Sequence, residues 1–362
     1  MAARSGSFPP LSAPARALLW FWAAVGTGLV CLVLLLAWLG PPPAAPGGGP
    51  VTAAAGAGKA PIALPSPSRA PGMPIPGPDP ALLEPDPDDP ARVLPRIGPE
   101  GQEAREAYAA GFDRRERRPR VAILITGAGL SRSDTAHAIE TLPAAVSFAF
   151  SPYADDLEAQ SAAARGRGHE VLVALPLEPE NYPLHDPGPE ALLSGARAED
   201  NARRLRWALS RFTAYVGATG ALGAGLHGER FAAEGGLLDA LEQSLAGRGL
   251  LYVDPRPGAP PPARVAGRTV DRVIGVDLDA AAIDAALAAL VDLAKRQGAA
   301  LALVDAPSPA LTARLAAWAG GLGAQDIALA PVSALATPPG SPPRANAASA
   351  PPASPSAAAE TP

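Results

Sequence analysis

The residues of this sequence best suited to chemistry are aspartates that come directly after short apolar runs. Asp254, Asp277 and Asp305 each occupy such a position. If the runs are parallel strands, the three carboxylates lie at one edge of the sheet, where they could bind a hard cation or a polar ligand. The other interpretation is that carboxylates at strand ends simply cap the loops that follow them.

The histidines give little support for a metal site. The sequence has four, with no His-x-x-x-His pair, whereas zinc needs three or four protein ligands. His227 with Glu229 is a candidate binding pair on a loop, and the alternative is a solvent-exposed loop histidine. His185 with Asp186 has the same two interpretations. His169 begins a predicted strand on the face opposite the candidate site, so we expect a structural role for it.

Several function classes are excluded by composition and motif. The formal net charge of −5 and the aromatic content of 5% argue against a nucleic-acid partner. Gly127-Ala128-Gly129 follows a predicted strand without completing Gly-x-Gly-x-x-Gly, and residues 220–228 are glycine-rich without a following Lys-Ser/Thr. The single cysteine, Cys31, excludes a disulfide within the chain.

The candidate residues must be positioned by a domain that we predict over residues 119–336. Short apolar runs alternate there with helical segments. The clearest helix, 279–297, places Ile283, Leu287, Leu290 and Ala294 on one face. Buried strands separated by helices indicate an α/β fold with a parallel sheet of about seven strands. Either an incomplete or deformed β/α barrel or an open doubly wound sheet fits, and both place a site at the carboxyl ends of the strands.

The N-terminal part of the chain predicts a membrane anchor. Residues 17–39 are uncharged and almost wholly apolar, and a helix of that length reaches roughly 35 Å. Arg4 and Arg16 precede this run, and the next basic residue is Lys59. The positive-inside rule therefore predicts a cytoplasmic segment 1–16, a transmembrane helix in the inner membrane, and a periplasmic domain. A cleaved signal peptide is the alternative, but its apolar core is usually only ~7–15 residues long.

The domain is flanked by segments of biased composition. Pro, Gly and Ala dominate residues 40–118, which predicts a disordered linker, with a short helix possible over 99–118. Residues 337–362 have the same Pro/Ala/Ser character and predict a disordered tail.

The order of motifs within 119–336 resembles the divergent polysaccharide deacetylases, a NodB-related family. The segments that carry the resemblance are 121–125 with 129–133, 147–154, 168–179, 201–217, 248–254 and 331–335. The resemblance implies a deformed β/α barrel that removes N- or O-acetyl groups from glycans. It also implies a divalent metal such as zinc, which polarises the acetyl carbonyl and activates water while a carboxylate acts as base.

The sequence departs from the family pattern where the metal would bind. Thr126 and Gly127 occupy the positions of a pair of aspartates, and Ala174 occupies that of a histidine. His227 is one residue out of phase with another family histidine, and Asp305 or Ala306 replaces a late one. We therefore assign no metal ligand and expect that the ancestral metal is lost.

What remains of the pattern gives candidates for the site. We name Asp254, Glu178 and Arg230 as candidate catalytic residues. The candidate binding residues are His227, Glu229, Asp277 and Asp305.

Three functional hypotheses follow. The first is a membrane-anchored family member in envelope carbohydrate metabolism, with a degenerate metal site and weak or no activity, that binds a polysaccharide or an envelope protein. The second is an active metal-dependent deacetylase with a rearranged site made of Asp254, Asp277, His227 and Glu229. The third is a structural envelope scaffold.

Overall fold

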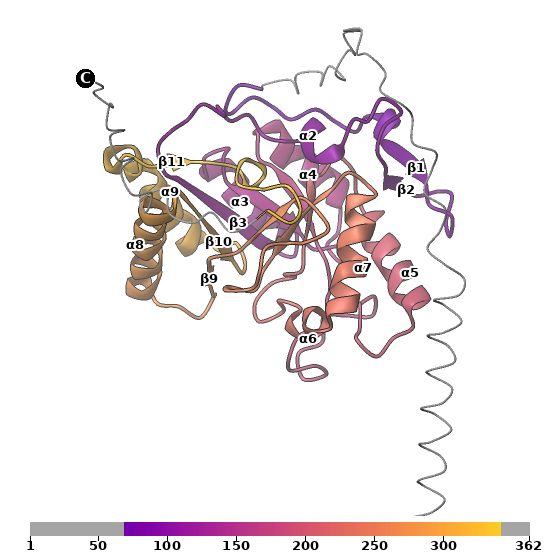
Figure 1. Cartoon of the computed structure of the whole chain (residues 1–362). Coiled ribbons are helices and arrows are strands. Elements are labelled where there is room, and N and C mark those ends of the chain that lie inside the picture. The colour runs from indigo at the N-terminus through magenta and orange to yellow at the C-terminus, as the bar shows by residue number, and fades with distance from the viewer. Residues whose placement is uncertain (1–68, 342–362) are drawn as a thin grey trace, which may run out of the picture. The chain divides into compact units, whose positions relative to one another are not determined.

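A computed structural model describes residues 69–341 of the chain (Figure 1). The segments predicted as a cytoplasmic N-terminus (1–16) and a transmembrane helix (17–39) lie outside this range. So do residues 40–68 of the predicted linker and 342–362 of the predicted tail. Within the described range, no helix has the length and apolar character needed to cross a membrane.

A parallel sheet forms the centre of the molecule, which confirms the predicted α/β class. Its strands pair in the order β8-β7-β6-β5-β4-β3-β10-β9, and β11 pairs with the start of β3. Their bounds are β3 Arg120–Ala128, β4 Ser147–Phe150, β5 Val171–Ala174, β6 Gly217–Thr219, β7 Leu251–Asp254, β8 Gly267–Thr269, β9 Arg272–Ile274, β10 Ala299–Val304 and β11 Ala328–Leu329. The strands are apolar without alternation because side chains on both faces of the sheet are buried.

One extended segment joins the two ends of this sheet. Only Val270 and Asp271 separate β8, which pairs with β7, from β9, which pairs with β10. The intervening amides continue both pairings, since Val270 N–H donates to Asp254 O and Asp271 N–H donates to Leu301 O. Residues 267–274 therefore act as a single strand that closes the sheet in the manner of a barrel, one of the two architectures that the sequence left open.

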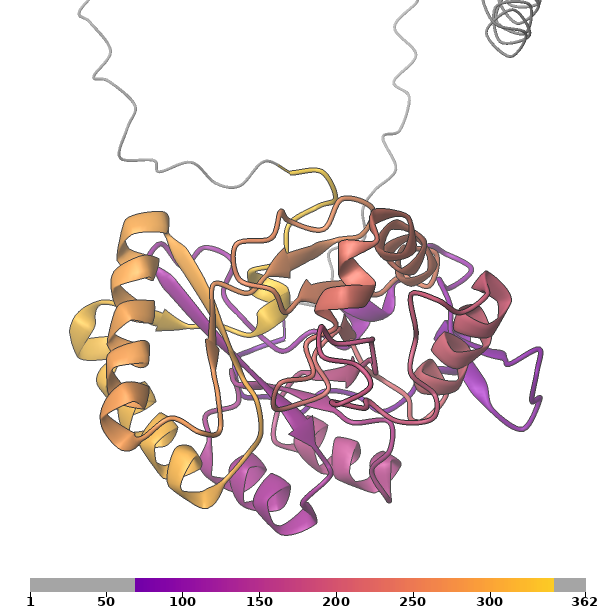
Figure 2. The same cartoon turned by 90° about the horizontal axis from the view of Figure 1, so that it is seen from below.

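Helices cover the outside of the sheet (Figure 2). They are α3 Arg132–Thr141, α4 Leu157–Gly166, α5 Ala198–Leu209, α6 Glu229–Ala233, α7 Gly235–Ala246, α8 Ala280–Gln297 and α9 Pro309–Gly321. Two of these helix ends are capped: Ser131 accepts the N–H of Asp134 at the start of α3, and Gly298 ends α8 in a left-handed conformation.

Residues 69–118 belong to the folded domain, so the prediction of a disordered linker is wrong for this part. They form a 3-10 turn (Pro80–Leu82), an antiparallel pair of strands, β1 (Leu83–Pro85) and β2 (Val93–Pro95), and helix α2. The helix expected over 99–118 is only Ala104–Ala107. Composition over the whole segment concealed a few apolar side chains that are buried against the domain, namely Ile75, Leu82, Leu94 and Tyr108.

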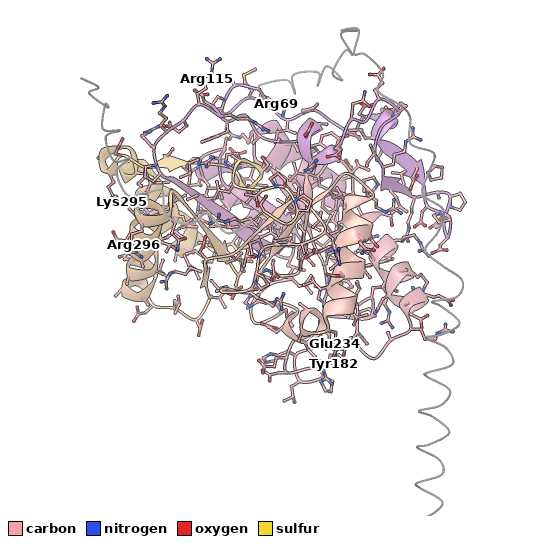
Figure 3. The ribbon with its side chains drawn as sticks, in the orientation of Figure 1. Arg69, Arg115, Tyr182, Glu234, Lys295 and Arg296 are labelled. Atoms are coloured by element: carbon pink, nitrogen blue, oxygen red, sulfur yellow. The ribbon has the colours of Figure 1, made fainter. Side chains whose placement is uncertain are left out.

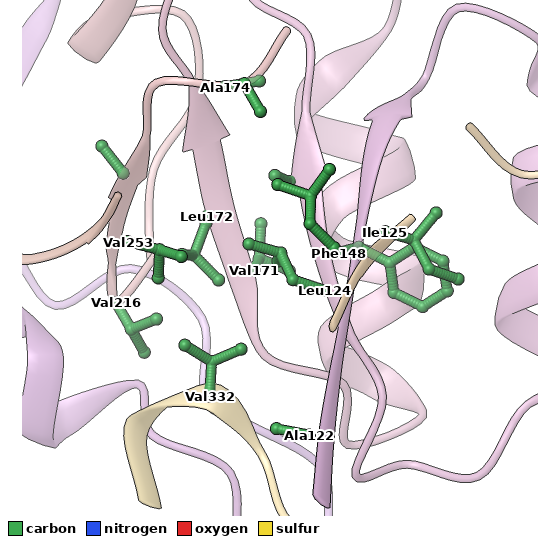
Figure 4. Packing of buried hydrophobic residues seen from close by; sticks show 14 of the residues in the cluster. Ala122, Leu124, Ile125, Phe148, Val171, Leu172, Ala174, Val216, Val253 and Val332 are labelled. Atoms are coloured by element: carbon green, nitrogen blue, oxygen red, sulfur yellow. The ribbon is translucent and has the colours of Figure 1, made fainter. Parts of the chain in front are cut away.

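A single hydrophobic cluster extends from Ile75 to Leu335, so the described part of the chain has its own core. Figure 4 shows Val332, from the C-terminal 3-10 turn Val332–Ala334, packed near Ala122 at the amino end of β3. The predicted tail also begins within the fold, because Thr337 and Gly267 exchange two backbone hydrogen bonds of 2.9 Å. The carboxyl ends of the strands form the opposite end of the barrel, which we call the mouth.

Candidate functional site

The glycine-rich loop 220–228, between β6 and α6, lies across the mouth. A Cβ on Gly223 would lie 3.5 Å from the carbonyl oxygen of Asp305 and 4.0 Å from Cα of Gly127. These residues follow β10 and end β3, whereas the loop begins at β6, which is separated from β3 by two strands. The loop thus reaches the far side of the ring and covers the region where a family member would bind its metal.

His227 fastens this loop to the end of β10. Its Nε2 lies 2.6 Å from Oδ1 of Asp305, and its Nδ1 lies 3.6 Å from Oε1 of Glu229 at the start of α6. The His227 side chain is largely buried rather than a solvent-exposed loop histidine. Three of the four predicted binding residues therefore meet at one point.

The two carboxylates hold the imidazole in its charged form. Burial alone would lower the pKa of His227, but the hydrogen bonds with Asp305 and Glu229 outweigh it and raise the pKa to about 9. At neutral pH both ring nitrogens therefore carry protons. A doubly protonated imidazole has no lone pair for a metal or for proton abstraction.

The fourth predicted binding residue, Asp277, lies beside this cluster. A Cβ on Gly275, which follows β9, would be 2.6 Å from Oδ1 of Asp277 and 3.7 Å from Oδ2 of Asp305. Asp277 is exposed, unlike Asp305. The structure therefore offers one solvent-facing carboxylate next to a neutralised pair.

Asp254, at the end of β7, is bound by an arginine. Nη2 of Arg256 donates to Oδ2 over 2.7 Å, Nε donates to Oδ1 over 3.0 Å, and the backbone N–H of Arg256 donates to Oδ1 as well. In this bidentate arrangement each carboxylate oxygen of Asp254 accepts a hydrogen bond from the guanidinium group. Asp254 and, more weakly, Glu229 both raise the pKa of Arg256, so this ion pair lies within electrostatic reach of the His227 cluster, but the carboxylate of Asp254 is held by Arg256.

Glu178 also forms an ion pair with an arginine. Its Oε1 pairs with Nε of Arg230 over 3.3 Å, and its Oε2 accepts the backbone N–H of Ser194. Glu178 is buried in the loop after β5, whereas Arg230 on α6 is half exposed. Two of the three predicted catalytic candidates therefore form an ion pair between this loop and α6.

The positions expected to carry paired aspartates have structural roles. The hydroxyl of Thr126 lies 3.2 Å from Val304 O and 3.1 Å from Asp305 O, so it bridges β3 and β10. Gly127 has φ +64°, and a Cβ there would lie 3.1 Å from Asp305 O. A side chain at position 127 would need both a left-handed backbone and a shift of the neighbouring strand end.

The donor set does not fit a resident metal. Among residues 69–341, no three His, Cys, Asp or Glu side chains are arranged to hold an ion. Asp254, Glu178 and Asp305 are paired with arginine or histidine, and Ala174 offers no ligand at the end of β5.

Two contributors to the site were not predicted from the sequence. Arg256 follows Asp254 by two residues, a spacing that permits an ion pair across a tight turn. The hydroxyl of Tyr252 is buried, and within the described residues it has no hydrogen-bond partner; a Cβ on Gly220 would lie 2.8 Å from it. The two-residue spacing from Asp254 in β7 places Tyr252 on the same face of the sheet.

Large apolar side chains are exposed around the mouth. Leu130 after β3, Leu184 after β5 and Val276 after β9 are 61%, 89% and 56% exposed, respectively. Figure 3 shows Tyr182, in the same loop as Leu184, at this end of the molecule. Such exposure is typical of a surface that binds a ligand or a partner.

The comparisons with known proteins agree with this fold. The family described as divergent polysaccharide deacetylase matches residues 123–336. The crystal structure of the uncharacterized protein ATU2773 from Agrobacterium tumefaciens C58 is 30% identical, with a TM-score of 0.61 over 67% of this chain and 99% of that one. No curated protein matches.

The matched segment is more than half of the chain, so this protein belongs to the divergent polysaccharide deacetylase family. This confirms the resemblance noted in the sequence. The site described above is therefore a family barrel in which ion pairs and a glycine-rich loop occupy the mouth.

Proposed function

We propose that this protein is a membrane-anchored, non-hydrolytic member of its family that binds an envelope glycan at the mouth of the barrel. Residues 17–39 would anchor it in the inner membrane, with the domain in the periplasm. The observation that carries the proposal is the pairing of the mouth carboxylates: Asp254 with Arg256, Glu178 with Arg230, and Asp305 with His227.

The residues in these pairs are not free to act as the base or as the metal ligands that deacetylation needs. A general base needs a free lone pair, and a metal needs several unpaired anionic or neutral ligands. His227 is cationic at neutral pH, and each paired carboxylate already faces a positive charge. Hydrolysis that used Asp254 or Asp305 would require breaking a largely buried pair, which typically costs several kcal/mol.

The same end of the barrel retains features that suit a sugar. Asp277 is exposed, so its carboxylate offers acceptors for hydroxyl groups. Leu130, Leu184 and Val276 offer apolar contacts for the carbon faces of sugar rings. Apolar walls with a few placed polar groups are the usual composition of a small-ligand site.

Calorimetric titration with N-acetylglucosamine oligomers and acetylated xylan oligosaccharides tests the proposal. We expect binding without acetate release, and Asp277→Asn should weaken it about tenfold, because a carboxylate–hydroxyl hydrogen bond contributes ~1.5 kcal/mol or more. Asp292→Asn removes the same charge from an exposed position on α8 and should leave binding unchanged. Binding that is equal in both variants would place the ligand elsewhere on the molecule, and no binding would favour the structural scaffold.

A further inference from the structure

The end of the molecule opposite the mouth carries an exposed basic turn, residues 113–118. It contains four arginines and two acidic residues, a surplus of positive charge in a chain whose net charge is −5. Arg118 pairs with Glu116, and Oδ1 of Asp113 accepts the N–H of Arg115. Arg114, Arg115 and Arg117 are exposed.

The basic turn lies beside the point where the described chain begins. A Cβ on Gly111 would clash with the carbonyl oxygen of Ala70, so the backbone just before the turn packs against the start of the described chain. One hollow of about 460 Å³ is lined by three arginines and two carboxylates, namely Arg69, Arg114, Arg115, Glu106 and Asp113. Figure 3 shows Arg69 and Arg115 at one end of the molecule and Tyr182 and Glu234 at the other.

An apolar side chain accompanies these charges. Met73 is 53% exposed, and the preceding Gly72 lines a second hollow together with Phe112 and Arg118. Basic residues next to an exposed apolar one are the combination that favours an anionic lipid surface, where arginines attract headgroups and the apolar side chain enters the interface.

We propose that the basic turn and Met73 dock onto the anionic lipid surface of the membrane that holds residues 17–39, and that the mouth then points away from that membrane. This rests on the anchor proposed above. Residues 40–68 span at most roughly 100 Å even when fully extended, so the basic turn always stays near the bilayer. A weak attraction is then sufficient, because tethering replaces a bimolecular association by an intramolecular one.

The expected effect is measurable. An arginine near an anionic surface favours the docked state by a factor of about five, so three exposed arginines together shift the docked-to-free ratio roughly a hundredfold. The attraction acts over a Debye length, about 10 Å at 0.1 M salt, and should therefore disappear at high ionic strength.

Lipid quenching in nanodiscs tests the proposal with the full chain. Cys31→Ser removes the only cysteine, and Met73→Cys then accepts a single fluorophore. We expect a nitroxide on the lipid headgroups to quench this fluorophore in discs containing 30% phosphatidylglycerol. Quenching should fall to the level of pure phosphatidylcholine discs in 0.5 M salt, and also after Arg114→Gln, Arg115→Gln and Arg117→Gln together.

A matched variant separates docking from a general effect of charge. Arg132→Gln, Arg197→Gln and Arg203→Gln remove the same charge from the starts of α3 and α5, near the mouth, and should leave quenching intact. Quenching that ignores both lipid charge and salt would overturn the docking while leaving the anchor standing. A chain that elutes apart from the discs would refute the anchor and the tethered docking together.

Discussion

Replacing His227 by glutamine removes the cation that fastens the glycine-rich loop to the end of β10. Asp305 and Glu229 raise the pKa of His227 to about 9, against burial, which acts in the other direction. A raised pKa in the folded state means that the native protein holds a proton that the unfolded chain releases near pH 6.5. This stabilisation is complete below pH 6.5 and is lost as the pH rises through 9. The difference between a pKa of about 9 in the folded protein and about 6.5 in the unfolded chain corresponds to roughly 3 kcal/mol in the free energy of unfolding.

Urea unfolding of residues 69–341 at a series of pH values from 6 to 10 measures this effect. The free energy of unfolding of the wild type minus that of His227→Gln should be constant near pH 6. It should then decline by roughly 3 kcal/mol by pH 9.5, while the groups that titrate in both proteins cancel. His185→Gln, which changes an exposed histidine of the neighbouring loop, should keep the pH dependence of the wild type.

The result that would refute this reasoning is a difference that stays flat across the whole range. A flat difference would mean that His227 is not held as a cation between Asp305 and Glu229. The imidazole would then be free to ligate a metal or to accept a proton, and the pairing of His227 could no longer account for a lack of hydrolysis.

Three further predictions concern stability, each read from denaturant unfolding. Gly127→Asp should lower the free energy of unfolding by about 1–3 kcal/mol, because position 127 needs a left-handed backbone pressed against Asp305; an unchanged stability would contradict this. Leu94→Ala should cost ~2–5 kcal/mol, whereas Met73→Ala should change stability by less than about 0.5 kcal/mol; equal effects would show that residues 69–118 do not share the core. Glu170→Ala should cost ~2–4 kcal/mol, since buried Glu170 accepts hydrogen bonds from the backbone of residues 110 and 333, and a cost near zero would mean that these donors find other partners.

The architecture was largely accessible from sequence because it depends on pattern. Uninterrupted apolar runs such as 121–125 predict strands covered on both faces, and the spacing within 279–297 predicts the helix that became α8. The closure of the barrel was not accessible. Residues 267–274 form two very short strands, half exposed and split between two neighbours, so they lack the apolar run that identifies the others.

The misjudged linker has a different cause. Proline and glycine content over 40–118 predicts disorder, but burial is decided by single residues such as Leu82 and Leu94 that have a surface to pack against. Proline is compatible with the edges of a two-stranded sheet, as Pro85 and Pro95 show. Composition averaged over a long segment hides such contacts.

The sequence named residues that lie close together, but it did not predict how their charges pair. Sequence pointed to His227, Glu229, Asp277 and Asp305, and the structure gathers them at the mouth. The sequence could not show that Arg256 would pair with Asp254, because that pairing depends on how the chain turns after β7. Nor could the sequence show that loop 220–228 crosses the mouth of the barrel, since the spacing of its glycines does not reveal the course of the loop.

The most direct test of the central claim is metal analysis of the purified full chain combined with an acetate-release assay on acetylated oligosaccharides. Our account predicts less than about 0.1 metal ion per chain and acetate release no faster than in buffer, with or without added zinc. Stoichiometric zinc together with acetate release that a chelator abolishes would contradict it.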